Sequence, residues 1–218
     1  MRAVRWVLAV AVVVGCRNAG PESEEHVAGH PSTASSIVAS RDDAGVHDMT
    51  DWESVKVLPQ PPRALDIAGT TWRVVDEIEM LNADSERKHG FAIQGAKDTY
   101  RERSMQRYPD DTKVDDTGHG LLEGVIEFDL LNLDAGRPVV VLHRLDYIVG
   151  NYQLEVSVNG TKVGQVACVG ADRVRRWRNW PIPIAAEYVT GRATRVRLKS
   201  LTPGRDIHIF HVWIYQAQ

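Results

Sequence analysis

The chain contains little of what disulfide scaffolds and common catalytic centres require. It has two cysteines in 218 residues, too few for a scaffold held together by disulfides. The HExxH, GxSxG, P-loop and dinucleotide-binding motifs are missing, so the sequence indicates no site of those kinds. A net charge of −3 argues against a general nucleic-acid-binding protein. At 43% hydrophobic residues, however, the chain is able to bury a real core.

The first sixteen residues have the features of an export signal. Arg2 and Arg5 precede an apolar run, residues 6–14, that is shorter than the roughly 20 residues needed to span a bilayer. The run ends in VVGC at residues 13–16, which resembles the bacterial lipobox. This resemblance implies that residues 1–15 are removed as a signal peptide and that Cys16 carries diacylglycerol and palmitate. The alternative is an ordinary secretory signal that happens to contain a cysteine.

The lipobox resemblance predicts an exported protein held at the bacterial cell envelope by lipid. Two or more acyl chains anchor a protein stably, whereas one chain binds only marginally. Arg17 follows the cysteine where an aspartate would favour inner-membrane retention, so the outer membrane is the expected location.

Residues 16–62 are expected to form a disordered linker. They are rich in small and polar residues and show no sustained periodicity. Residues 17–62 hold eight acidic and three basic side chains, whereas residues 63–218 hold 21 of each. The net negative charge therefore belongs to the linker. Residues 55–58 are apolar enough to pack on the domain, which leaves the boundary open by several residues.

Residues 63–218 have the pattern of an all-β domain. Residues 152–158 alternate apolar and polar, and Asn159-Gly160 predicts a tight hairpin turn into a return strand over 161–169. Residues 207–215 are apolar on both faces, which predicts one central strand. A short helical turn is expected at 185–189. The remaining expected strands are 72–81, 91–103, 120–131, 138–147, 176–184 and 195–199.

Short strands separated by regular turns predict an antiparallel β-sandwich. In their order along the chain, five segments also resemble galactose-binding-domain-like jelly rolls, the fold of many carbohydrate-binding modules. They are residues 79–90, 139–147, 152–160, 177–192 and 206–215. The resemblance implies a non-catalytic carbohydrate-binding domain with a polysaccharide as partner. A protein-interaction or envelope-assembly module of the same fold, with an envelope protein as partner, is the first alternative.

Trp177 is the first candidate for sugar binding. Trp180, Ile182 and Ile184 share one parity and are expected to face the core, so Trp177 and Asn179 face away from it. An exposed indole can stack on a pyranose ring, while Arg178 and Asn179 hydrogen-bond the hydroxyls. The alternative is that a loop covers Trp177 and that the arginines around it form a solvated surface.

Arg144 and Asp146 share one face of a strand and are further candidate ligand contacts. The alternative is a structural ion pair or a position on the solvent side of the sheet. Glu127 and Asp129, also two residues apart, are a nonspecific candidate carboxylate pair for a third possibility, a small polysaccharide-active enzyme.

A structural calcium ion is a further implication of the jelly-roll resemblance, because similar domains carry one near their first and last strands. Calcium takes six to eight oxygen ligands. The carboxylates at suggestive positions are Glu79, Asp84, Glu86 and Asp206. The alternative is that these acids form a solvated surface.

Overall fold

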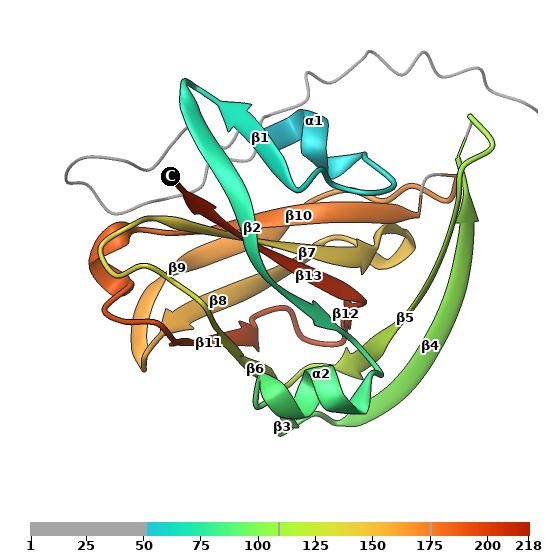
Figure 1. Cartoon of the computed structure of the whole chain (residues 1–218). Coiled ribbons are helices and arrows are strands. Elements are labelled where there is room, and N and C mark those ends of the chain that lie inside the picture. Colours follow the sequence, from blue (N-terminus) through green and yellow to red (C-terminus); the bar gives the residue numbers. More distant parts are fainter. Residues whose placement is uncertain (1–51, 109, 175) are drawn as a thin grey trace, which may run out of the picture. The chain divides into compact units, whose positions relative to one another are not determined.

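The computed structural model describes residues 52–108, 110–174 and 176–218, and Cys16 with its signal and most of the linker lies outside them. The described chain consists mainly of antiparallel strands in three sheets (Figure 1). The predicted all-β antiparallel sandwich is confirmed. Within the described residues, no helix has the length and apolarity needed to cross a membrane.

The first sheet has five strands in the order β1-β2-β13-β7-β10. Their bounds are β1 Ala64–Ile67, β2 Thr70–Glu79, β13 His211–Ala217, β7 Val139–Asp146 and β10 Trp177–Ile184. All eight residues of β7 are buried, because this strand has packed side chains on both faces of the sheet. Such a strand is expected to be a nearly continuous apolar run, as residues 139–142 are.

The second sheet also has five strands, in the order β3-β6-β11-β8-β9. Their bounds are β3 Ala92–Gln94, β6 Val125–Leu130, β11 Thr194–Ser200, β8 Tyr152–Val158 and β9 Thr161–Cys168. The β8–β9 hairpin turns at Asn159 and Gly160, whose φ angles of 49° and 82° fit the predicted turn. The main core, which includes Phe128, Val141 and Leu154, fills the space between this sheet and the first.

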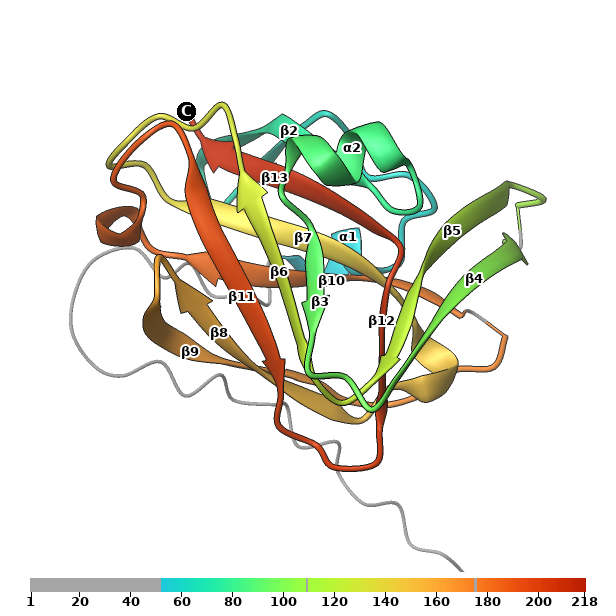
Figure 2. The same ribbon diagram turned by 90° about the horizontal axis from the view of Figure 1, so that it is seen from below.

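A smaller third sheet has the order β12-β5-β4 (Figure 2). It contains β12 Asp206–Ile209, β5 Lys113–Leu122 and β4 Asp98–Arg107. Short helical segments complete the fold: α1 Glu53–Lys56, α2 Ala83–Lys88 and the 3-10 turns Tyr147–Val149 and Ala186–Tyr188. The last of these confirms the helical turn expected at 185–189.

Three expected strands are each broken into two, so the prediction of single strands there is wrong. Residues 91–103 divide into β3 and β4, and residues 120–131 divide into β5 and β6. The breaks fall at Gly95 and at Glu123-Gly124, which adopt positive φ. Residues 207–215 divide at Phe210, where the chain passes from the third sheet to the first.

The packed domain also extends further toward the N-terminus than residue 63. Trp52 and Val55, which the sequence places in the linker, are buried on the outer face of the first sheet. There they join Trp72, Trp213 and Tyr215 in a second core. Figure 1 shows α1 on this side, next to β1. The large apolar area available there explains why this segment packs on the sheet.

Candidate functional site

A polar cluster lies where the third sheet meets the end of β7. It consists of Tyr100 and Glu102 on β4, Asp206 and His208 on β12, Asp146 at the end of β7 and Arg176 just before β10, and is called the β4–β12 cluster below. Tyr100 and Glu102 are two residues apart and therefore point to the same face of β4. Asp146 is the sequence-predicted sugar contact that the structure places in this cluster.

Arg176 and His208 hold the carboxylates of this cluster. Arg176 forms a two-atom contact with Asp146, and its Nη2 lies 3.4 Å from Glu102 Oε1. His208 Nε2 lies 2.7 Å from the Tyr100 hydroxyl, and its Nδ1 lies 3.5 Å from Glu102 Oε2. The nearest ligand atoms of Glu102, Asp146 and His208 are all within 4.8 Å of one another.

The electrostatics of the cluster are dominated by its acids. Burial lowers the pKa of His208 against the pull of Glu102, so the ring is neutral at pH 7. Burial, with Asp206 and Glu102 nearby, raises the pKa of Tyr100 far above its usual range. The hydrogen bond with Asp146 raises the pKa of Arg176. Three carboxylates thus face one guanidinium, and the cluster is net negative.

Two glycines of β5 make room beneath this cluster. A Cβ atom at Gly120 would lie 2.2 Å from Tyr100 Cζ, so the tyrosine ring lies directly against the β5 backbone. A Cβ atom at Gly118 would lie 2.4 Å from the carbonyl oxygen of Ile209. Because this face of β5 has no side chains at these two positions, Tyr100 of β4 and the β12–β13 junction can both approach the β5 backbone closely.

Trp177 is buried, not exposed, and the expectation of a surface indole is wrong. Only 2% of its surface is accessible. Its ring packs edge-on against Phe210 at 4.4 Å between centroids, and Tyr108 and Val114 complete this small core. The predicted parity is confirmed, because Trp180, Ile182 and Ile184 do face the main core. The outward face is covered by segments distant in sequence.

Arg144 and Asn179 are also buried, at 2% and 1% exposure, and belong to the fold. Arg144 donates from Nε to Asn179 Oδ1 at 3.2 Å and from Nη1 to Asp116 at 3.0 Å. Asn179 donates from Nδ2 to the carbonyl oxygens of Val55 and Leu58. These two residues therefore do not form an accessible sugar site.

Arg178 and Asp146 have structural partners as well. Arg178 lies over the Tyr147 ring at 4.9 Å and is 3.2 Å from Asp172. Asp146 is 2% exposed and accepts a hydrogen bond from the Ile148 amide as well as from Arg176. The alternative of an ion pair between Arg144 and Asp146 is not formed either, since each pairs with a different residue.

The four acids expected to hold calcium do not gather as ligands. Glu79 accepts from Asn82, Asp84 pairs with Arg87, and Glu86 accepts from the amide of Leu81 and contacts His119. Asp84 and Glu86 lie on helix α2, which Asn82 caps by accepting from the amides of Asp84 and Ser85. Asp206 lies instead in the β4–β12 cluster. A structural calcium ion stays a prediction, and the four carboxylates do not converge as its binding would require.

Glu127 and Asp129 are not a free carboxylate pair either. Glu127 forms ion pairs with Arg195 and Arg197 on β11, and Asp129 lies 3.2 Å from Arg195. Cross-strand charge pairs of this kind stabilise a sheet surface. Both carboxylates are therefore engaged by arginine side chains of β11.

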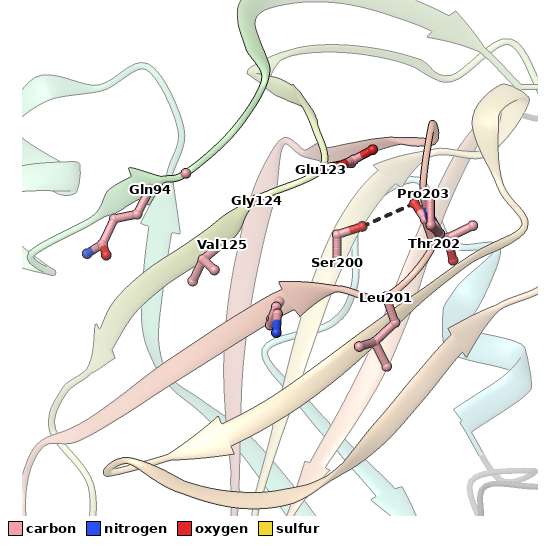
Figure 3. Close-up of a pocket in the computed structure, with 10 residues that line it drawn as sticks. Gln94, Glu123, Gly124, Val125, Ser200, Leu201, Thr202 and Pro203 are labelled. Carbon is pink, nitrogen blue, oxygen red and sulfur yellow. Dashed lines mark hydrogen bonds between the residues drawn. The ribbon is translucent and has the colours of Figure 1, made fainter.

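A shallow pocket of about 280 Å³ lies elsewhere, between the end of β11 and the β5–β6 turn (Figure 3). Its lining includes Gln94, Glu123, Lys199, Ser200 and Thr202. No aromatic side chain lines it, so it offers polar groups but no stacking surface. None of the sequence-predicted site residues lines this pocket.

Comparisons with known proteins give weak likenesses. No protein-family model matches the chain, and no curated protein matches it either. Among solved structures, a family 35 carbohydrate-binding module from Clostridium thermocellum is similar to it with a TM-score of 0.45 and 12% identity, over 64% of this chain and 98% of the module. A family 35 module from Paenibacillus barcinonensis has a TM-score of 0.41 and 18% identity, over 64% and 97%.

An exo-β-1,3-galactanase from Phanerochaete chrysosporium is similar with a TM-score of 0.45 and 14% identity. This match covers 69% of the present chain and 32% of the galactanase. Likenesses this distant do not decide what the present chain binds.

Proposed function

We propose that the chain is a lipid-anchored, exported protein whose β-sandwich binds carbohydrate without catalysis, and that Tyr100 is its stacking residue. The observation that supports this is the exposure of Tyr100. Among the described residues it is the most exposed aromatic residue, with 36% of its surface accessible. An accessible ring of this kind is what a pyranose ring needs for stacking.

The surroundings of Tyr100 supply the polar half of such a site. Glu102 and Asp206 offer carboxylate oxygens, which accept strong hydrogen bonds from sugar hydroxyls. Arg176 offers donors and is 30% exposed. A ring with a few convergent polar groups is the usual make-up of a small-molecule site. The proposed ligand is a neutral or basic polysaccharide, because the cluster is net negative.

The proposal is tested with a matched pair of substitutions on one strand. Tyr100→Ala removes the ring, whereas Met105→Ala removes an exposed side chain of β4 that has the opposite parity. The full-length protein is screened on a glycan array, and hits are measured by affinity electrophoresis. Tyr100→Ala is expected to weaken binding about thirtyfold, since loss of a binding hot spot costs about 2 kcal/mol. Equal binding by Tyr100→Ala and the native chain would reject the site.

A polysaccharide-active enzyme is the second candidate, favoured by the proximity of Glu102 and Asp146. Glycoside hydrolysis uses two carboxyl groups about 5–10 Å apart. Against this candidate, Asp146 is 2% exposed and is held by Arg176. Release of reducing sugar from any array hit, abolished by Glu102→Gln, would replace the binding proposal with this one. A protein partner captured by crosslinking in intact cells, together with no glycan hit, would favour the envelope-assembly alternative.

A further inference from the structure

Glu102, Asp146 and His208 bring two carboxylates and one imidazole together from three different strands. Among the described residues they are the one group of three or more potential metal ligands whose atoms all lie within 4.8 Å of one another. We propose that this trio is a binding site for a divalent transition-metal ion, with Zn²⁺ as the best match. The proposal does not depend on glycan binding.

The imidazole of His208 supplies the first argument. Its side chain is 5% exposed, and its Nδ1 is buried without a hydrogen-bond partner. That nitrogen lies 3.5 Å from Glu102 Oε2, a separation too long for a normal hydrogen bond. A buried polar atom without a partner carries a desolvation cost. A cation held between His208 Nδ1 and Glu102 Oε2 would remove that cost. When the proton of His208 is on Nε2, Nδ1 and Oε2 are both acceptors, and a cation between them would also offset their repulsion.

The charge of the surroundings supplies the second argument. Glu102, Asp146 and Asp206 contribute three negative charges, and Arg176 contributes one positive charge. Arg176 contacts both oxygens of Asp146 but only Oε1 of Glu102, which leaves Oε2 directed at His208. The remaining charge of −2 matches a divalent cation.

The ligand types decide which cation fits. Calcium and magnesium take oxygen ligands, whereas an imidazole with carboxylates suits zinc. Zinc bonds of about 2.0–2.2 Å place tetrahedral ligand atoms about 3.4 Å apart. The trio, whose atoms lie within 4.8 Å of one another, therefore has to close by up to about 1.4 Å. Glu102 can supply this movement, because its side chain is 25% exposed and lies on the β4–β5 hairpin. A bound ion would then tie that hairpin to the end of β7.

The experiment uses the full-length protein after dialysis against EDTA, in the absence of any glycan. Isothermal titration with Zn²⁺ and with Ca²⁺ gives stoichiometry and affinity, and the absorption spectrum of the Co²⁺ form reports the ligand field. We expect one Zn²⁺ per chain and much weaker binding of Ca²⁺. Glu102→Gln and His208→Gln are each expected to weaken Zn²⁺ binding about tenfold or more and to change the Co²⁺ spectrum.

The matched control is His119→Gln. His119 also contacts a carboxylate, at 2.7 Å from Glu86, but lies outside the trio, so its substitution should leave Zn²⁺ affinity unchanged. No Zn²⁺ uptake by the native chain would overturn the proposal whether or not the variants fold. Zn²⁺ affinity unchanged in Glu102→Gln, or equal affinity for Ca²⁺, would overturn it as well. A chain that binds glycan but no metal would reject this site and leave the proposed function standing.

Discussion

Arg144 Nη2 donates a 2.5 Å hydrogen bond to the carbonyl oxygen of Pro59, which precedes it by 85 residues. The same guanidinium lies 4.8 Å from the centroid of the Trp213 ring. Arg144 thereby fixes the N-terminal segment, residues 52–62, over the outer face of the first sheet. A buried guanidinium has several donors in a fixed plane, so it can satisfy carbonyl oxygens that are no longer hydrated.

Asn179→Ala tests how much this attachment stabilises the domain. The substitution removes the donor to Val55 and Leu58 and the acceptor of Arg144 Nε, so several buried groups lose their partners. We expect a loss of about 3 kcal/mol in the free energy of unfolding, measured by urea denaturation with tryptophan fluorescence. Gln153→Ala, which truncates an exposed amide on β8, is expected to change it by less than about 0.5 kcal/mol. Similar values for the two variants would show that the segment contributes little.

The local parts of the fold follow from the sequence. Alternation over 152–158 and the Asn159-Gly160 turn depend on neighbouring residues, and the hairpin forms as predicted. The break at Phe210 depends on distant partners instead, because its amide bonds to Arg144 and its carbonyl oxygen accepts from Met80. The apolar run that continues across residue 210 contains no sign of that exchange between sheets.

The candidate site is less accessible to sequence reasoning. The face on which Trp177 lies is set by parity, but whether it is exposed depends on what covers that face, here residues around Tyr108 and Phe210. The β4–β12 cluster is assembled from three strands and so has no compact motif. The closest local signal is the pair Gly118 and Gly120 on one strand face, which indicates close approach of other groups.

Gly118→Ala is expected to destabilise the domain. Its Cβ atom would lie 2.4 Å from the backbone oxygen of Ile209 and 2.6 Å from the Phe210 ring, and the backbone cannot move aside freely. Overpacking of this kind costs about 1–3 kcal/mol, which thermal unfolding would detect as a lower midpoint. Gly164→Ala on β9 is the control, because no atom lies within 4 Å of its added Cβ. A midpoint lowered equally in both variants would contradict the steric explanation.

Cys16→Ser tests the proposed anchor, which lies outside the described residues. If Cys16 carries the lipid, the substitution should move the protein from the membrane fraction to the soluble fraction and abolish labelling with radioactive palmitate. Cys168→Ser is the matched control, since Cys168 is fully buried in the main core and is not available for modification. Labelling that persists in Cys16→Ser and disappears in Cys168→Ser would reject the assignment.

His143 predicts how stability depends on pH. Burial lowers its pKa to about 4, with its Nδ1 bonded to the Trp180 carbonyl oxygen at 3.0 Å. The unfolded chain takes up this proton near pH 6.5, whereas the folded chain resists until about pH 4, so stability falls as the pH drops through this window. The contribution of this one group to the free energy of unfolding is about 3 kcal/mol at full effect.

His143→Gln should therefore flatten the dependence of the unfolding free energy on pH between 6.5 and 4, measured by urea denaturation at several pH values. Some slope will remain, because burial also lowers the pKa of His211 to about 4. Identical slopes for the native chain and His143→Gln would mean that the folded protein already accommodates a charged His143.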